Sequence, residues 1–231
     1  MRNIPQLFFL LLGILSCQPV VESTADWQLL GFEKADAVNP VLSPDTTTRF
    51  IDPITKDTVM WEGKDVFNPA SVVRNDTLFL LYRAEDFVGK YNGTSRIGLA
   101  YSLDGRTFTR YIAPVFYPTE DSVKRYEWEG GAEDPRVVES SDGTYIMTYT
   151  GYDGRLARLL VASSEDLIHW VKHGPAFVRE NDINQWSKSG SIVSALVGNT
   201  MIAKKINDYY WMYFGDTDLF LARSRDLIKW E

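Results

Sequence analysis

AYSLDGRTF at residues 100–108, ASSEDLIHW at residues 162–170 and ARSRDLIKW at residues 222–230 are three copies of one pattern. Each copy has the form A-x-S-x-D-(G/L)-x-x-(F/W), and successive copies begin 62 and 60 residues apart. Ser and Asp favour turns, and the closing aromatic residue is typical of a strand that resumes after a turn. The repeat predicts that one supersecondary unit occurs several times along the chain.

Short β-rich segments precede each copy in pairs. The segment nearest to each copy spans 78–82, 145–149 and 210–214, and the segment before it spans 70–73, 136–138 and 191–193. Turn residues separate the first two pairs, as expected of hairpins. No stretch shows a long helical period, so each unit is predicted to hold about four short antiparallel strands, which is typical of a β-propeller blade.

About three such units fit between residue 36 and the end of the chain, and Glu231 directly follows the third turn. A propeller closes into a ring, which removes its sheet edges. We therefore expect an all-β fold with further blades after residue 231. A closed three-bladed domain is the alternative.

Composition restricts the class of partner. The chain has 231 residues and a net charge of −7, which argues against a nucleic-acid partner because phosphate binding needs a basic face. Aromatic residues make up 13%, which fits either sheet packing or stacking on sugars. The sequence has no metal-ligand spacing, nucleophile elbow or phosphate loop, so we expect no metal and no cofactor.

The N-terminus resembles a bacterial lipoprotein leader. Arg2 precedes an apolar run at residues 7–15 that is too short to span a bilayer. The run ends in Ile14-Leu15-Ser16-Cys17, which resembles a lipobox, and Cys17 is the one cysteine of the chain, so an intramolecular disulfide is impossible. An ordinary signal peptide with a chance cysteine is the alternative.

These features predict a signal peptide at 1–16, a tether at 17–35 and a partial propeller at 36–231. With lipid on Cys17, the protein is expected in the bacterial cell envelope, anchored at the periplasmic or outer-membrane face.

Two polar residues begin strands at matching points of successive units. Asn68-Pro69 opens the first unit and Asp134-Pro135 opens the second, 66 residues later. Inner strands of a propeller begin at its central funnel, so these side chains are expected to line a site. Asn-Pro and Asp-Pro are also common turn starts.

Several segments, in order, resemble signatures of glycoside hydrolase family 130, the β-mannoside hydrolases and phosphorylases. They are Phe67-Asn68-Pro69-Ala70, Leu81-Tyr82-Arg83-Ala84-Glu85, Ser95-Arg96-Ile97-Gly98-Leu99-Ala100, Gly131-Ala132-Glu133-Asp134-Pro135-Arg136 and Lys205-Ile206-Asn207-Asp208-Tyr209-Tyr210. The resemblance runs from about residue 64 to 231 and implies a five-bladed propeller, of which this chain covers about three blades.

The resemblance implies that Asp134 is the general acid, which protonates the glycosidic oxygen by way of a sugar hydroxyl. Asn68 and Arg83 match residues that contact the sugar at the cleavage subsite. Arg96 is expected to take part in substrate binding, where it orients a carboxylate or a hydroxyl.

Three further residues are candidates for binding substrate. Glu133 either contacts sugar or forms an internal ion pair with an arginine such as Arg83. Lys188 is expected at the start of the third unit's inner strand, where it either binds a hydroxyl or remains a solvated loop residue. Lys205 belongs to the segment that resembles K-I-N-G-K-Y.

One departure from the family pattern favours hydrolysis over phosphorolysis. Phosphorylases of the family bind phosphate with basic side chains on both sides of the K-I-N-G-K-Y segment, where this chain has Leu196-Val197-Gly198 and Tyr213-Phe214-Gly215-Asp216. A carboxylate repels phosphate but is suited to activating water. Asp216 is thus a candidate base, although it lies in a turn sequence and the base can also lie beyond residue 231.

The sequence therefore predicts an inverting exo-hydrolase of β-mannosides, similar to the family's β-1,2-mannosidases, that acts on β-linked mannose oligosaccharides. One alternative is a β-mannoside phosphorylase that releases mannose 1-phosphate. Another is a non-catalytic glycan-binding lipoprotein.

Overall fold

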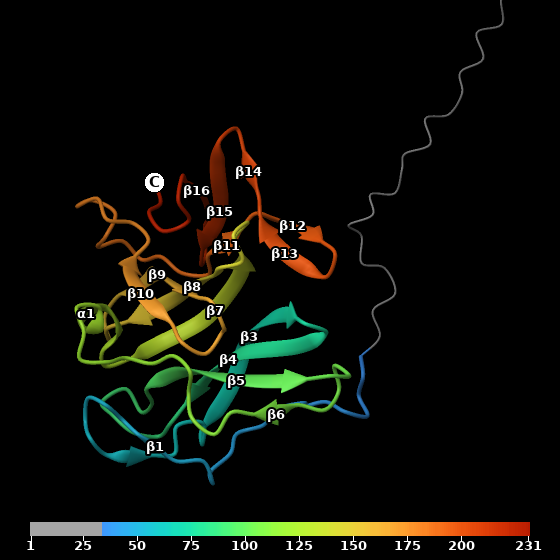
Figure 1. Cartoon of the computed structure of the whole chain (residues 1–231). Helices are drawn as coiled ribbons and strands as arrows, with labels where there is room; N and C mark the ends of the chain where they lie inside the picture. Colours follow the sequence, from blue (N-terminus) through green and yellow to red (C-terminus); the bar gives the residue numbers. More distant parts are fainter. Residues whose placement is uncertain (1–33) are drawn as a thin grey trace, which may run out of the picture. The chain divides into compact units, whose positions relative to one another are not determined.

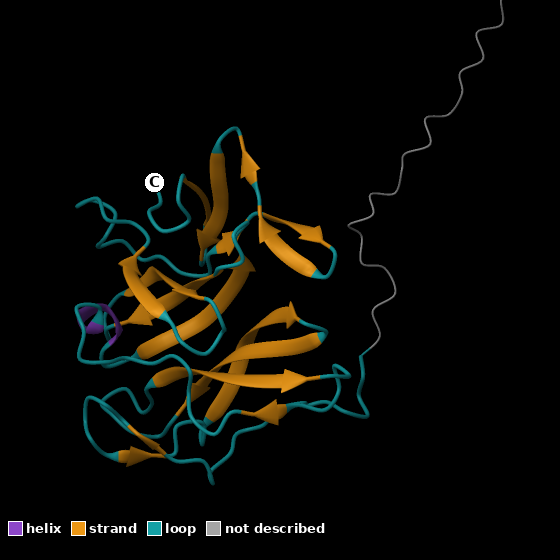
Figure 2. Cartoon of the chain, in the orientation of Figure 1, coloured by secondary structure: helices purple, strands orange, loops and turns teal. Residues whose placement is uncertain are grey.

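A computed structural model describes residues 34–231, of which residues 36–231 form one compact unit. The predicted signal peptide, Cys17 and nearly all of the predicted tether lie outside the described residues. Within the described part the fold is all-β, as expected, with a single short helix, α1 (Lys124–Glu127) (Figure 2). No helix in this part is long and apolar enough to cross a membrane.

The first two units are four-stranded antiparallel meanders, as the repeat predicted (Figure 1). The first consists of β3 (Asp65–Arg74), β4 (Thr77–Glu85), β5 (Ser95–Ser102) and β6 (Thr109–Arg110). The second consists of β7 (Gly131–Glu139), β8 (Tyr145–Tyr152), β9 (Ala157–Ser164) and β10 (Val171–Pro175). A separate ladder, β1 (Phe50–Ile51) with β2 (Thr58–Val59), precedes them.

The two units join at one parallel residue pair, Ser95 with Gly131. Gly131 has a φ of +114°, and a Cβ there would lie 2.2 Å from the carbonyl oxygen of Ser95. Only glycine permits this approach. The start of the second unit's inner strand is therefore held directly against the first unit.

The third unit contains a hairpin that the sequence analysis did not predict. Its strands are β11 (Ser191–Ile192), β12 (Ser194–Val197), β13 (Thr200–Ala203), β14 (Lys205–Ile206), β15 (Tyr209–Gly215) and β16 (Leu219–Ser224). Val193 still bonds to Trp211, but β12 and β13 then pair with each other, and Ile202 of β13 pairs with Glu139 of β7. The hairpin projects from the unit toward the far ends of the earlier inner strands (Figure 1).

The repeated sequence pattern has one structure in all three units. In the first copy Ser102 Oγ donates to Asp104 at 2.9 Å and accepts from Gly105 N at 2.9 Å. The aspartates of all copies accept hydrogen bonds from the backbone N–H groups two and three residues later, at residues 106–107, 168–169 and 228–229. The residue after each aspartate has a left-handed φ of 68° to 70°, which glycine adopts freely and Leu167 adopts at a cost.

Leucine is used at this strained position because its side chain is buried. Leu167 and Leu227 are 0% and 3% exposed, so apolar burial offsets the backbone strain. The indole N–H groups of Trp170 and Trp230 donate to the carbonyl oxygens of these two leucines. The final tryptophan of the pattern thus stabilises the turn itself.

Hydrophobic cores lie between successive units. Leu81 and Leu99 of the first unit pack with Met147 and Leu160 of the second. The neighbouring residues on β8 and β9 point the other way and pack with the third unit, in the cluster of Ile146, Leu159, Val161, Ile192, Met212 and Ala222. The second unit is thus buried on both faces, which is the packing expected of sheets stacked around an axis.

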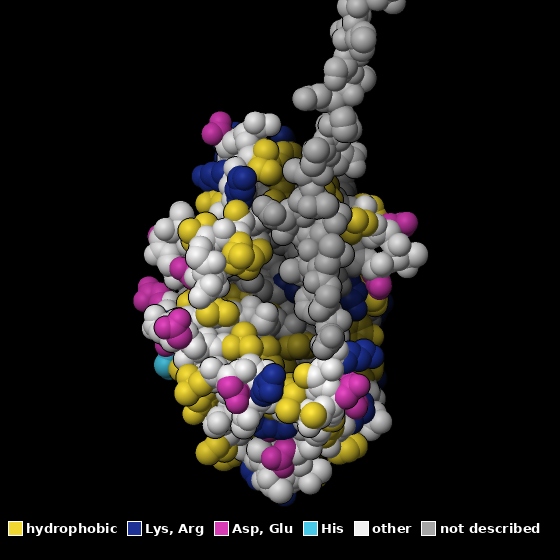
Figure 3. All heavy atoms as spheres, turned by 90° about the vertical axis from the view of Figure 1, so that its right-hand side faces the viewer, with side chains coloured by type: hydrophobic (Ala, Val, Ile, Leu, Met, Phe, Trp, Pro, Cys, Tyr) yellow, Lys and Arg dark blue, Asp and Glu magenta, His cyan; other side chains and the backbone are white. Residues whose placement is uncertain are grey.

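The outer part of the third unit is more exposed. β16 pairs with β15 alone among the named strands, and its residues Leu219, Phe220 and Leu221 are 50–73% exposed. On the face drawn in Figure 3, hydrophobic side chains lie among charged residues of both signs.

Candidate active site

The same backbone distortion begins the inner strand of all three units. Phe67 and Ala70 pair with Arg83 and Leu81, so two residues of β3 oppose one residue of β4. Glu133 and Arg136 pair with Thr150 and Thr148 in the same way. Lys188 and Ser191 likewise oppose Gly215 and Tyr213 in the third unit. Bulges of this kind re-aim side chains.

The bulges place Asn68, Asp134 and Ser189 at equivalent points, and these residues have left-handed φ values of 46°, 49° and 56°. Asn and Asp tolerate this conformation better than most residues. Asn68 Nδ2 donates to Asp134 Oδ1 at 2.8 Å. Two residues expected at matching points of successive units therefore touch.

Asp134 is the centre of a charged cluster. It is 5% exposed and accepts a hydrogen bond from Arg83 Nη1 at 3.2 Å in addition to the one from Asn68. Lys188 Nζ lies 3.6 Å from its other oxygen. The first and third units thus each contribute at least one polar side chain to a carboxylate of the second unit.

Arg83 links three carboxylates. Its Nη2 contacts Glu133 Oε1 at 3.0 Å and Glu85 Oε1 at 2.5 Å, while Nη1 contacts Asp134. Of the alternatives for Glu133, the ion pair with Arg83 is present. The guanidinium also lies 4.6 Å from the centre of the Phe67 ring, which restricts its orientation.

The two adjacent carboxyl groups have opposite pKa shifts. Burial raises the pKa of Glu133 to about 7, although the charge of Arg83 opposes the shift. Burial also acts to raise the pKa of Asp134, but the hydrogen bond from Asn68 and the charge of Arg83 outweigh it and hold this pKa below its usual value. Near neutral pH the unliganded site therefore offers one ionised carboxylate beside one that readily holds a proton.

Asp216 is exposed, and within residues 34–231 it forms no hydrogen bond or ion pair with this cluster. Its Oδ2 accepts a 3.2 Å hydrogen bond from Trp186 Nε1. The residue follows Gly215, which opposes Lys188, so it lies at the same end of the unit as the cluster. A role as base stays a prediction.

Arg96 lies outside the cluster, contrary to the expectation that it orients a substrate group. It is 1% exposed, and its Nη atoms contact Asp52 and Asp86 at 2.6 Å each. With both carboxylates paired to it inside the protein, the guanidinium is occupied by structural contacts. We therefore correct its predicted role to support of the fold.

Lys205 is also apart from the cluster. It is exposed on β14, and its Nζ lies 4.9 Å from the centre of the Tyr210 ring. The structure brings together Asn68, Arg83, Glu133, Asp134 and Lys188, and it places Lys205, Asp216 and Arg96 elsewhere.

Three residues that the sequence analysis did not single out complete the cluster. Glu85 contacts Arg83 and also pairs with Lys64 Nζ at 3.0 Å. Ser95 Oγ accepts from Arg83 Nε at 3.0 Å and donates to Glu85 Oε1 at 3.1 Å. Glu85 follows Arg83 by two positions on one strand. Because side chains alternate between the two faces of a sheet, this spacing predicts that Arg83 and Glu85 lie on the same face.

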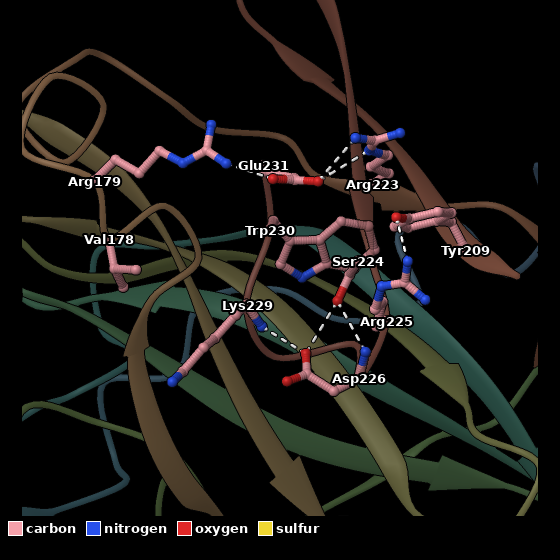
Figure 4. A pocket seen from close by; sticks show the side chains of 10 residues that line it. All are labelled: Val178, Arg179, Tyr209, Arg223, Ser224, Arg225, Asp226, Lys229, Trp230 and Glu231. Carbon is pink, nitrogen blue, oxygen red and sulfur yellow. Dashed lines mark hydrogen bonds and ion pairs between the residues drawn. The ribbon is translucent and has the colours of Figure 1, made fainter.

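Two cavities adjoin different parts of the fold. One, of about 280 Å³, lies between the inner strands of the three units and is lined by Pro69, Val137 and Ile192, with Met201 of the inserted hairpin. The other, of about 340 Å³, lies near the C-terminal turn (Figure 4). In it Arg179 and Arg223 both contact Glu231, and it contains none of the clustered residues. Within residues 34–231 no group of His, Cys, Asp and Glu is arranged to hold a metal ion.

Comparisons with known proteins agree with the resemblance noted in the sequence. The model of glycoside hydrolase family 130, described as β-1,4-mannooligosaccharide phosphorylase, matches residues 33–231. A 1,2-β-oligomannan phosphorylase of Thermoanaerobacter sp. (strain X514) is 35% identical over 179 residues, which are 74% of this chain and 53% of that protein.

Solved structures match more closely. A glycosyl hydrolase from Bacteroides ovatus is 48% identical with a TM-score of 0.82, over 87% of this chain and 57% of that one. Another structure is 45% identical with a TM-score of 0.84, over 89% of this chain and 59% of that one. It was reported with the finding that the family of mannoside phosphorylases contains glycoside hydrolases that target β-1,2-mannosidic linkages in Candida mannan. The chain spans about half the length of the first curated relative.

Proposed function

The chain belongs to glycoside hydrolase family 130, and from this premise we propose that it acts as part of an inverting exo-hydrolase of β-mannosides. The substrate class is a β-linked mannose oligosaccharide, with β-1,2 linkages favoured. The observation that carries the proposal is the convergence of Asn68, Arg83 and Lys188 on Asp134.

In this proposal Asp134 is the general acid. Asn68 and Arg83 hold its pKa low in the unliganded site, whereas an acid must carry a proton when the bond breaks. Substrate binding must therefore weaken one of these contacts or bring a proton-sharing hydroxyl to Asp134. The 3.6 Å contact with Lys188 is the longest of the three. Glu133, which precedes Asp134 in sequence and has a pKa of about 7, can supply a proton to the site.

Hydrolysis is favoured over phosphorolysis by the charges around the cluster. Arg83 and Lys188 already face carboxylates, and neither is free to hold a phosphate dianion without leaving them. Gly215-Asp216 supplies a carboxylate where the family's phosphorylases supply a cation. The solved structure reported with β-1,2-mannan hydrolases is also more similar to this chain than the curated phosphorylase is.

The second candidate is a β-mannoside phosphorylase that releases mannose 1-phosphate. It is supported by the names of the curated relatives and by the description of the family model. The deciding experiment incubates the full-length protein with β-1,2-mannobiose, with and without phosphate, and analyses the products by NMR. The hydrolase yields α-mannose in both cases, whereas the phosphorylase needs phosphate and yields mannose 1-phosphate.

Two further proposals concern the setting of the domain. We propose that the stacked four-stranded units belong to a five-bladed propeller, a reading supported by the packing of the second unit on both faces. We also propose that lipid on Cys17 anchors the protein to the cell envelope, with residues 17–35 as the tether.

A further inference from the structure

Two tyrosines form a pair at the end of the strands where the carboxylate cluster lies. Tyr152 is the last residue of β8, two positions after Thr150, which pairs with Glu133. Alternate residues of a strand share a face, and paired residues of neighbouring strands share it as well. Tyr152 therefore extends the face that carries Glu133, and the ring centre of Tyr91 lies 6.1 Å from that of Tyr152.

Tyr91 is carried by a loop that is tied down at its base. Buried Asp86 accepts hydrogen bonds from Val88 N at 3.0 Å and Thr94 N at 2.9 Å. Glu129, which lies just before β7, accepts from Lys90 N at 3.0 Å. The loop thus bridges the first two units, and it begins directly after Glu85, a member of the carboxylate cluster.

The ring of Tyr91 is held in place and is still accessible. A Cβ on Gly154 would lie 2.2 Å from three atoms of the Tyr91 side chain, so the ring packs directly on the glycine backbone. Lys90 Nζ lies 5.3 Å from the ring centre. Even so, Tyr91 remains 37% exposed. A ring that is fixed before binding loses little entropy when a ligand packs on it.

A pyranose ring has an apolar face of C–H groups and a rim of hydroxyls, so it packs well on a fixed aromatic ring. Resting on the proposed function, we propose that Tyr91 and Tyr152 form the aromatic wall of a subsite for the sugar next to the one that is released. Its ligand is a neutral β-linked oligosaccharide of two or more residues. This aromatic wall favours oligosaccharides over simple glycosides. The carboxylate cluster acts on the glycosidic bond that is cleaved.

The test compares two substrates in the full-length protein: methyl β-mannoside, which has no second sugar, and β-1,2-mannotriose. For Tyr91→Ala we expect kcat/KM on mannotriose to fall about tenfold, the effect of losing one aromatic contact. The loss should appear mainly in KM, with methyl β-mannoside turned over as in the wild type. Tyr91→Phe keeps the ring and should restore mannotriose turnover.

Tyr101→Ala is the matched control, because Tyr101 is 36% exposed and lies on β5 at the opposite end of the first unit. It should leave the ratio of the two substrates unchanged. An unchanged ratio in Tyr91→Ala, or an equal loss on both substrates, overturns the subsite while the proposed function stands. A wild-type protein that turns over neither mannoside overturns the proposed function, and the mannoside subsite falls with it.

Discussion

Asn68 Nδ2 lies 2.8 Å from Asp134 Oδ1, although 66 residues separate the two. The contact exists because β3 and β7 begin with equivalent bulges, in which Asn68 and Asp134 have φ values of 46° and 49°. The bulges aim both side chains to the same point, where Arg83 also reaches Asp134. A repeated backbone irregularity has thus placed unlike side chains in one site.

Replacing Asp134 tests the acid. Asp134→Asn keeps the size of the side chain and an oxygen for Asn68, but it removes the transferable proton. We expect kcat on β-1,2-mannobiose to fall about 10²–10⁴-fold, the usual contribution of general acid–base catalysis. Asp76→Asn, at an exposed turn, is the control and should retain full activity. Wild-type turnover by Asp134→Asn would remove this residue from the mechanism.

The carboxylate of Asp216 is tested in the same assay. If it activates water, Asp216→Asn should slow release of mannose by about 10²-fold or more, while added phosphate leaves the rate of the wild type unchanged. Trp186→Phe removes the indole donor at 3.2 Å and should change the rate less than Asp216→Asn does. Unchanged hydrolysis by Asp216→Asn would place the base elsewhere.

Arg96 is expected to affect folding and not substrate affinity. Arg96→Leu leaves the buried carboxylates of Asp52 and Asp86 without their cation, which typically costs about 3–5 kcal/mol. Urea or thermal unfolding should therefore show a large loss of stability, whereas Arg106→Leu, at an exposed position, should show little. A raised KM with unchanged stability would restore the earlier expectation of a substrate contact.

Local patterns in the sequence predicted much of the fold. The Ser and Asp of each repeat predicted turns because their side chains bond to the next backbone N–H groups, and all three turns have these bonds. The strands before the first two turns follow from alternating apolar residues that pack on both sides. These turns and strands depend on residues that are close in sequence, so they can be predicted from a single sequence.

Long-range contacts were harder to predict. Arg96 is 44 residues from Asp52, and nothing in its own segment shows that two buried carboxylates meet it. The hairpin of β12 and β13 was also missed, although Gly198-Asn199 at its tip is a hairpin signal. The pairing of this hairpin with β7 through Ile202 depends on how the units stack, which the local sequence does not show.

The anchor is tested outside the folded domain. If Cys17 carries lipid, Cys17→Ser should shift the protein from the detergent fraction to the soluble fraction or leave an unprocessed leader, because the acyl chains supply the affinity for the bilayer. Metabolic labelling with a fatty acid should mark the wild type and not the variant. If the Cys17→Ser protein has a cleaved leader and still requires detergent for extraction, the lipobox prediction is wrong.

Glu133 gives the site a pH dependence whose sign follows from its environment. Burial raises its pKa to about 7 from the usual value of 4.5, so the folded protein binds this proton more tightly than the unfolded chain does. The stability that results is fully present below pH 4.5 and is lost as the pH rises through 7.

Glu133→Gln has no such proton, so its stability relative to the wild type should improve between pH 4 and pH 8, by about 3 kcal/mol if Glu133 alone titrates. Urea unfolding of the full-length wild type and variant at both pH values measures this difference, and Glu165→Gln, at an exposed turn, is the control.

Asp134 and Glu85 have lowered pKa values and act in the opposite direction, but both remain in each protein and cancel in the comparison. Stability curves of wild type and Glu133→Gln that run parallel across this range would show that the pKa of Glu133 is the same in the folded and the unfolded protein. Glu133 would then not hold a proton near neutral pH, and the proton for Asp134 would have to come from elsewhere.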